Sequence, residues 1–261
     1  YQVNSFTIEC YLAYWTGYEQ RIKAARLDPA VQSHSLAVDY GDGRGDLDPR
    51  TVMAEAMTKW YHSDVNSDNV LFTVGGAGAL RIIFESFNRR YADIPKYRVI
   101  TPFPYYTLYA DNRHQLHPID VMKEPGYRLT AKTLEESIKA ATLLAKQDNN
   151  APKVVLLCNP GNPLGTVILE DELKKIAEVL RKYPDLHIVI DEAYAEMYWK
   201  GKKVPSLLEL APDLKNRVII LRSATKALSC AGERMAMLMA FDPDLMNSFR
   251  NISISSIGHA P

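Results

Sequence analysis

Short apolar runs rich in valine and isoleucine alternate with stretches of helical periodicity from residue 70 onward. The pattern predicts strands at residues 70–74, 98–101, 153–158, 187–190, 218–221 and 235–241, and helices at 79–91, 133–146, 170–182 and 204–210. Nearly continuous apolar strands joined by helices are typical of a mostly parallel sheet that is buried on both faces. The sequence therefore predicts an α/β fold with helices on both sides of a central sheet.

The part of the chain before residue 70 predicts two further helices. Aromatic and aliphatic residues mix over residues 6–27, which favours an N-terminal helix. A loop rich in glycine and aspartate follows from Tyr40 to Pro49. Asp48 and Pro49 then indicate a helix start, with Asp48 as the N-cap, and we expect this helix to run to about Tyr61.

The composition argues against several classes of protein. The chain has 31 basic and 31 acidic residues, and this balance predicts neither a nucleic-acid partner nor a membrane-surface partner. No apolar run reaches the length of a membrane span. Three widely spaced cysteines favour neither a disulfide framework nor a zinc cluster. We therefore expect a cytoplasmic protein that holds no metal.

Polar, aromatic or glycine-rich segments follow five of the predicted strands directly. Because ligands of such sheets bind beyond the carboxyl ends of the strands, each segment is a candidate part of a site. The segments are Gly75 to Leu80, Pro102 to Tyr109, Asn159 to Gly165, Asp191 to Tyr194, and Arg222 to Lys226. Five such segments in order along the chain indicate one shared ligand.

Three of these segments are ambiguous when each is taken alone. Glycines between a strand and a helix let backbone N–H groups approach an anion, but a plain tight turn has the same composition. The aromatic residues after the second strand could stack on a planar ring or simply pack against the core. The two Asn-Pro pairs at residues 159–163 fix an irregular backbone, as a generic loop also does.

Asp191 and Lys226 give the more specific chemical indications. A carboxylate at the end of a buried strand is costly unless it is paired, although aspartate at such a place also commonly caps a helix. A lysine held beside a buried strand end suits Schiff-base chemistry, whereas most lysines lie on the surface. Arg234 follows Lys226 by eight residues.

Together these motifs resemble the fold type I pyridoxal phosphate (PLP) enzymes of the aspartate aminotransferase superfamily, class I/II. The resemblance runs from Tyr40 to Arg234 and rests on three motifs. They are Ser223-x-Thr225-Lys226 with Arg234, Asn162-Pro163-Leu164-Gly165, and Asp191-x-Ala193-Tyr194. It implies a three-layer αβα domain with a mixed, mostly parallel sheet.

The resemblance also implies a domain organisation. Residues 1–39 would form an N-terminal arm or helix region, and residues 40–261 the PLP-binding large domain. The family continues well beyond this length. We therefore expect a fragment that lacks most of the small domain, together with the arginine that binds the substrate α-carboxylate.

The resemblance assigns catalytic and ring-binding roles to five residues. Lys226 would carry PLP as a Schiff base and then act as the general base. Asp191 would pair with the protonated pyridine nitrogen. Tyr194 and Asn162 would hydrogen-bond the phenolic oxygen of the ring, and Tyr106 would stack on the ring face.

A second set of residues would hold the cofactor phosphate. The resemblance implies Gly76, Ala77, Ser223 and Arg234 for this role. Ala77 stands where aspartate aminotransferases carry a hydroxyl residue, so one phosphate hydrogen bond would be missing. Tyr40 is similar to the family's tyrosine that reaches the phosphate of the neighbouring subunit, which implies a homodimer.

The activity implied is transfer of an amino group between an L-amino acid and a 2-oxo acid. One alternative is a C–S lyase, decarboxylase or cyclase on the same scaffold, because the reaction depends on which bond of the substrate α-carbon is aligned with the π system of the ring. Another is a non-catalytic aminotransferase-like domain. The complete set of lysine, aspartate, asparagine, tyrosine and arginine argues against that second alternative.

Overall fold

The computed structural model describes residues 20, 42–111, 113–198 and 203–256. The chain divides into two compact units, Tyr1–Asp42 and Gly43–Pro261, and the helices and strands named below belong to the second. The helix predicted at residues 6–27 lies outside the described residues, apart from residue 20, which is helical. Tyr40 also lies outside them, so its predicted role and the predicted domain boundary stay predictions.

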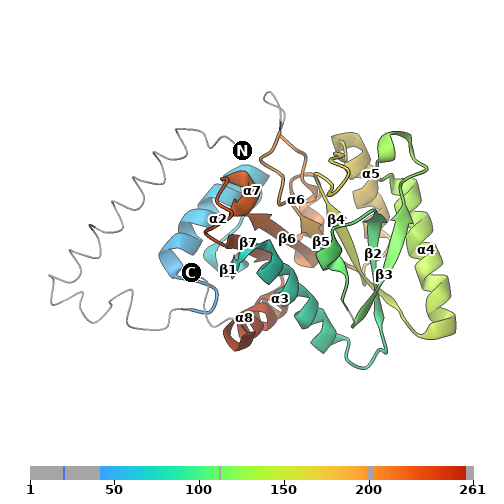
Figure 1. Cartoon of the computed structure of the whole chain (residues 1–261), viewed down its shortest axis with the longest axis horizontal. Helices are drawn as coiled ribbons and strands as arrows, with labels where there is room; N and C mark the ends of the chain where they lie inside the picture. Colours follow the sequence, from blue (N-terminus) through green and yellow to red (C-terminus); the bar gives the residue numbers. More distant parts are fainter. Residues whose placement is uncertain (1–19, 21–41, 112, 199–202, 257–261) are drawn as a thin grey trace. The chain divides into compact units, whose positions relative to one another are not determined.

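Seven strands form one sheet in the order β1-β7-β6-β5-β4-β2-β3 (Figure 1). Their bounds are β1 Val70–Val74, β2 Tyr97–Phe103, β3 His114–Asp120, β4 Pro152–Cys158, β5 His187–Asp191, β6 Val218–Ser223 and β7 Met235–Ala240. β7 runs antiparallel to both of its neighbours, and the other neighbouring pairs are parallel. The sheet is therefore mixed and mostly parallel, as the sequence predicts.

Helices cover both faces of the sheet, which gives three layers and confirms the predicted αβα fold (Figure 1). One face of the sheet, which we call the α3 face, packs against α3 (Gly75–Arg90) and α8 (Pro243–Ser256). The opposite face, which we call the α5 face, packs against α2 (Leu47–Tyr61), α4 (Ala131–Asp148), α5 (Glu170–Arg181) and α6 (Leu207–Leu210). The short elements are α7 Ala224–Ala227, η2 Ser67–Asn69, η3 Thr107–Tyr109, η4 Pro125–Tyr127 and η5 Pro212–Arg217.

Each central strand supplies apolar side chains to both layers of helices. In β4, Val154 and Leu156 face α3, whereas Val155 and Leu157 face α5, and all four are buried. This division follows from the strand pleat, which points successive side chains to opposite faces. Burying one such side chain stabilises the fold by about 1.5–3 kcal/mol. The need for apolar residues on both faces explains why the strands read as continuous apolar runs.

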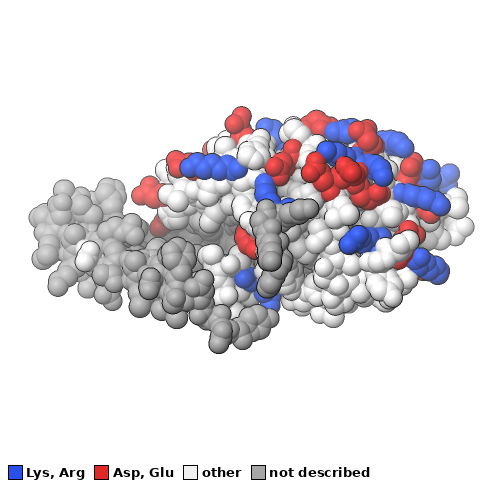
Figure 2. Space-filling model, turned by 90° about the horizontal axis from the view of Figure 1, so that it is seen from above, with Lys and Arg blue, Asp and Glu red and all other residues white. Residues whose placement is uncertain are grey.

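The helices, in contrast, carry an apolar side and a charged side. In α5, Leu173, Ile176 and Leu180 recur at helical spacing and are buried, whereas Lys174 forms an exposed ion pair with Glu170 at 2.6 Å. The face of the molecule shown in Figure 2 carries acidic and basic side chains side by side. Neither sign of charge dominates that face.

All six predicted strands are present, within two residues at each end. The helices predicted at 133–146 and 170–182 are confirmed as α4 and α5. β3 was not predicted, because its sequence HQLHPID mixes polar residues and includes Pro118. β3 is an edge strand, where proline is tolerated because one side of the backbone needs no partner. The helix α8 is also not predicted, since serine and asparagine interrupt its apolar pattern.

Three predicted helix boundaries are wrong. Helix α3 begins at Gly75 rather than at 79, directly at the end of β1, because the glycines that indicate a turn form its first turn. The helix α2 begins at Leu47 with Asp46 as N-cap, so Asp48 is a first-turn residue and not the cap. The predicted helix at 204–210 is reduced to Leu207–Leu210, because the residue before Pro205 is restricted to extended backbone.

Candidate functional site

The carboxyl ends of β4, β5 and β6 lie next to one another in the sheet. Asp191 pairs with Cys158 on one side and with Leu221 on the other. Val189 and Leu221 belong to the core of the α3 face. Because side chains alternate along a strand, Asp191 and Ser223 lie on that same face. The sheet thus brings the aspartate and the serine of two separate motifs to one edge, on the side covered by α3.

The first turn of α3 forms a cradle with Arg234 and Ser223. Gly75 has a φ of +65°, and a Cβ added there would lie 2.5 Å from Arg234 Nη2, so the guanidinium packs against the glycine. The Gly75 N–H donates to the Arg234 carbonyl at 2.6 Å. A Cβ on Gly76 would lie 4.0 Å from Ser223 Oγ. A helix N-terminus, a hydroxyl and a guanidinium therefore converge, which is a typical arrangement for binding an anion.

Ala77 lies at the third position of α3, with its side chain exposed. It adds no hydroxyl to this cradle, as the sequence predicts. The Arg234 guanidinium also donates from Nη1 to the Ala231 carbonyl at 3.0 Å. This bond holds the arginine beside the helix start, so the charge is in place before an anion arrives.

Asp191 is buried and accepts two hydrogen bonds. The Tyr109 hydroxyl donates to Oδ2 at 2.7 Å, and the Ala193 N–H donates to Oδ1 at 3.0 Å. Burial raises the pKa of the Asp191 carboxyl, although both hydrogen bonds act in the opposite direction. A positively charged group placed against this carboxylate would stabilise its ionised form.

Lys226, Tyr194 and Asn162 lie together, although they come from three different strand ends. The Lys226 Nζ lies 5.9 Å from the centre of the Tyr194 ring. Asn162 Nδ2 donates to the Tyr194 hydroxyl at 3.3 Å. Lys226 is half-buried in α7, whose N-cap Ser223 accepts a hydrogen bond from the Thr225 N–H at 3.3 Å. The Lys226 amine, the Tyr194 phenol and the Asn162 amide thus lie close to one another.

The loop after β4 is fixed by Asn159, the first residue of its motif. This buried side chain donates to the Pro205 carbonyl at 3.1 Å and accepts from the Ile168 N–H at 3.0 Å. Cis peptide bonds precede Pro160 and Pro163. The Asn159 side chain therefore holds the loop in place, and Asn162 is the residue of this loop that hydrogen-bonds Tyr194.

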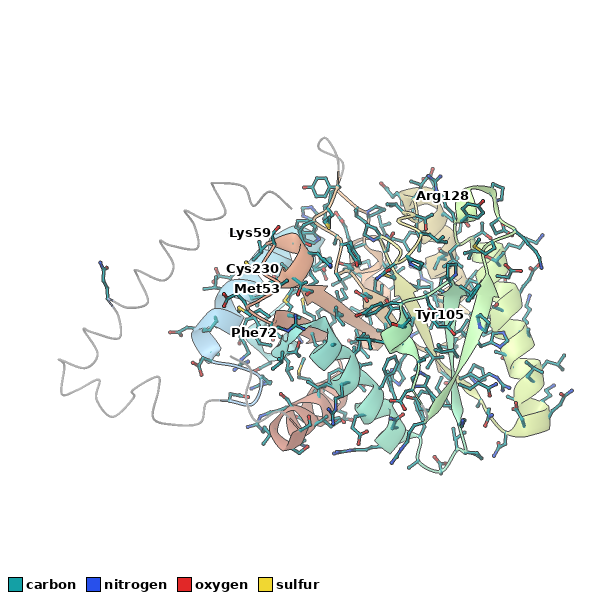
Figure 3. All side chains as sticks on the ribbon, in the orientation of Figure 1. Met53, Lys59, Phe72, Tyr105, Arg128 and Cys230 are labelled. Atoms are coloured by element: carbon teal, nitrogen blue, oxygen red, sulfur yellow. The ribbon has the colours of Figure 1, made fainter. Side chains whose placement is uncertain are left out.

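Tyr106 is half-buried against the core of the α3 face and immediately precedes η3. Its ring lies edge-on to Tyr109, with centroids 5.7 Å apart. Its neighbour Tyr105 is labelled in Figure 3 and packs edge-on to Phe103 at 5.8 Å. A hollow beside these residues is lined in part by Tyr105, Tyr109, Cys158 and Asn162.

Cys158 faces the same hollow with a neutral thiol. Burial raises its pKa to about 12. Its Sγ donates to the Pro160 carbonyl at 3.1 Å. Cys230, labelled in Figure 3, lies after α7 and donates to the Leu228 carbonyl at 3.1 Å. Cys158 therefore adds a neutral polar group beside Asp191 rather than a reactive thiolate.

A second buried polar network lies on the opposite face of the sheet and was missed from the sequence. Glu192 accepts hydrogen bonds from Tyr61 at 2.6 Å and from Ser206 at 2.7 Å. Arg222 Nη1 donates to the Tyr61 hydroxyl at 2.9 Å and lies 3.6 Å from Glu192 Oε2. Arg222 also pairs with Glu196. The signal that could have revealed this network is a charged residue next to a candidate site residue at each of two buried strand ends, Glu192 beside Asp191 and Arg222 beside Ser223.

The structure therefore brings the predicted residues into three groups. Gly76, Ser223 and Arg234 lie at the start of α3; Asn162, Tyr194 and Lys226 form the second group; Tyr106 and Asp191 are joined through Tyr109. Within the described ranges, no three histidine, cysteine or acidic side chains are placed to hold a metal ion. No helix among those ranges is long and apolar enough to span a membrane.

Comparisons with known proteins give matches at the level of the family and the fold. The sequence model of the family "Aminotransferase class I and II" matches residues 17–260. A probable aspartate/prephenate aminotransferase of Rickettsia bellii is 30% identical over 177 residues, covering 66% of this chain and 40% of the relative. The 1-aminocyclopropane-1-carboxylate synthase 2 of Solanum lycopersicum is 26% identical over 244 residues, covering 88% of this chain and 48% of the relative.

A similar solved structure is the aspartate aminotransferase from Rhizobium meliloti. It has a TM-score of 0.73 at 21% identity, covering 92% of this chain and 56% of that one. This likeness shows the fold. The chain spans 40% and 48% of the two curated relatives described above.

Proposed function

Because the chain belongs to the aminotransferase class I and II family, we propose that it forms the PLP-binding part of an enzyme that transfers an amino group between an L-amino acid and a 2-oxo acid. The observation that carries this proposal is a buried carboxylate, Asp191, at the same sheet edge as Ser223 and the α7 lysine. A structural ion pair would give the aspartate a basic partner, whereas its observed donors are a phenol and an amide N–H.

The residues present fit three of the polar parts of PLP: the phosphate, the ring nitrogen and the aldehyde. The cradle of Gly76, Ser223 and Arg234 suits a phosphate. The Asp191 carboxylate suits a protonated ring nitrogen, which would offset the cost of its burial. The amine of Lys226 suits the aldehyde carbon. A cofactor bound in this way would act as an electron sink for the substrate α-carbon.

The protein side of the chemistry follows from these contacts. Lys226 would bind the aldehyde carbon and, once released by the incoming amino acid, hold and move the α-proton. Tyr194 and Asn162, linked at 3.3 Å, would orient the phenolic oxygen of the ring. Asp191 would keep the ring nitrogen protonated. Tyr106 would cover one ring face and exclude water from it.

The proposal includes a homodimer in the cytoplasm, with no nucleic-acid or membrane partner. Tyr40 would reach the phosphate bound by the neighbouring subunit. The balanced charges and scattered cysteines of the sequence support this setting. The proposal also needs an arginine for the substrate α-carboxylate, and none of the residues described above is assigned that role.

A second candidate activity is elimination or cyclisation on the same cofactor. Similarity to a 1-aminocyclopropane-1-carboxylate synthase over 88% of the chain favours it. The residues described above serve both reactions, because the alignment of the substrate bond decides between them. Incubation with single amino acids separates the two: transamination needs a 2-oxo acid acceptor for turnover. Without an acceptor, elimination releases ammonia and cyclisation releases the leaving group of the substrate side chain.

The test of the proposal is covalent trapping. The purified chain is mixed with PLP, reduced with borohydride and digested, and the modified residue is identified by mass spectrometry. We expect PLP on Lys226, no adduct in Lys226→Ala, and a normal adduct in the control Lys203→Ala, whose lysine pairs with Glu209 away from the cradle. An unmodified wild-type chain, or an adduct elsewhere, would contradict the proposal.

A further inference from the structure

Tyr109 ends the candidate segment Pro102 to Tyr109, but the resemblance gives it no role, and it contacts two residues that have one, Asp191 and Tyr106. We propose that Tyr109 is a positioning residue, which holds the Asp191 carboxylate and the Tyr106 ring in their places for the cofactor. This inference rests on the proposed function, since it concerns the same site. Tyr109 itself would not touch the reacting atoms.

Tyr109 contacts both the buried carboxylate of Asp191 and the ring of Tyr106. The Tyr109 hydroxyl donates to Asp191 Oδ2 at 2.7 Å, and Tyr109 is only 1% exposed. The Tyr109 N–H donates to the Tyr106 carbonyl at 3.0 Å, and the two rings are nearly perpendicular, at 88°. Movement of Tyr109 would therefore displace both the carboxylate and the stacking ring.

The segment is also anchored from the edge of the sheet. His114, the first residue of β3, lies with Nε2 2.7 Å from the Tyr109 carbonyl. Burial lowers the pKa of His114, so its ring is neutral, and the carbonyl can only accept. Nε2 must therefore carry the proton, and we assign this tautomer. Its Nδ1 has no hydrogen-bond partner among the described residues, which agrees with the assignment.

The hydrogen bond has a defined direction. Burial and the nearby Asp191 raise the pKa of the Tyr109 phenol, so it stays protonated and acts as the donor. Donation to a carboxylate stabilises its charged form. Ala193 N–H and the neutral Cys158 thiol are the other groups beside this pair. The phenol thus favours an anionic Asp191, and an anionic Asp191 favours a proton on the nitrogen of a bound ring.

Tyr97 provides a matched control. It is also a buried tyrosine of the α3 face, and its hydroxyl donates to Asn88 at 2.9 Å. Both Tyr109→Phe and Tyr97→Phe delete one buried phenol hydrogen bond. Only the first deletes a bond to Asp191.

The test uses PLP labelled with nitrogen-15 in the ring and measures the nitrogen resonance in each protein. We expect the wild-type and Tyr97→Phe complexes to show a protonated ring nitrogen. The Tyr109→Phe resonance should move toward the neutral pyridine, and its PLP dissociation constant should rise about tenfold. A merely structural role for Tyr109 would leave the resonance unchanged.

The outcomes separate the two proposals. A wild-type chain that binds no PLP would overturn the proposed function and this inference together. A wild-type complex in which Tyr109→Phe and Tyr97→Phe give the same resonance would overturn this inference alone. A double-mutant cycle with Asp191→Asn on PLP affinity gives a second measurement: additive losses would show that the two residues are not coupled.

Discussion

The hydroxyl of Tyr61 donates a 2.6 Å hydrogen bond to Glu192 Oε2, although the two residues are 131 positions apart in the sequence. Glu192 directly follows Asp191, and Arg222, which joins the same network, directly precedes Ser223. Successive side chains of a strand point to opposite faces of the sheet. The ends of β5 and β6, which carry the candidate site residues on one face, are therefore hydrogen-bonded to Tyr61 of α2 on the other face. The network therefore fixes the backbone from which Asp191 and Ser223 project.

Arg222→Met should destabilise the protein by about 3 kcal/mol, because it leaves Glu192 buried without its positive partner. Urea unfolding of the purified chain measures this loss. Arg181→Met is the control, since its ion pair with Asp213 at 2.8 Å is on the surface and should contribute less than about 1 kcal/mol. Equal losses in the two variants would show that the network adds no more than a surface pair.

Gly75→Ala should weaken PLP binding by about tenfold or more, because the new Cβ would meet the Arg234 guanidinium at 2.5 Å and displace it from the cradle. Gly165→Ala is the matched control: Gly165 also has a positive φ, of +68°, but no atom lies within 4 Å of the added Cβ. Both should lose about 1 kcal/mol of stability from backbone strain. A PLP titration followed by fluorescence separates them, and equal affinities would argue against the cradle.

His187→Phe should reduce the amount by which the unfolding free energy falls as the pH is lowered. Burial lowers the pKa of His187 to about 4, below its ordinary value of about 6.5, so the unfolded chain binds the proton more tightly. The unfolding free energy is therefore unaffected by this group above about pH 6.5 and falls as the pH drops toward 4.

At pH 5 the effect of His187 is about 1 kcal/mol after allowance for solvent screening. Urea unfolding of wild type and variant at pH 7 and pH 5 gives the comparison. Phenylalanine keeps the contact with Phe87, whose ring lies 5.0 Å from the imidazole. His114, whose pKa burial also lowers, will retain part of the acid sensitivity in both proteins. An identical fall of the unfolding free energy between pH 7 and pH 5 in the two proteins would contradict the role assigned to His187.

Asp191→Asn should retain PLP but lose activity by about 100-fold or more, because the amide cannot hold a positive charge on the ring nitrogen. The measurement is amino-group transfer from an L-amino acid to a 2-oxo acid under saturating cofactor. Asp213→Asn, which alters only a surface ion pair, should keep normal rates. Rates in Asp191→Asn close to wild type would refute the role proposed for the carboxylate.

The sequence predicts the strands of this fold well because burial on both faces leaves a continuous apolar run. It does not predict β3, whose edge position permits proline and polar residues. Nor does it predict that Tyr109 contacts Asp191, since the two are 82 residues apart and a tyrosine is equally common in a core. Ordered motifs predict candidate ligand-binding residues, whereas the supporting hydrogen bonds depend on distances that only the folded chain defines.

The absence of any linker between β1 and α3 has a consequence for how this region can vary. Val74 ends the strand and Gly75 begins the helix. One residue inserted between them would rotate α3 by about 100° about its axis relative to the strand. Its buried side would then face water, and its amino end would no longer aim at Arg234. Changes in chain length should therefore accumulate elsewhere among natural variants, and this junction should keep a constant number of residues.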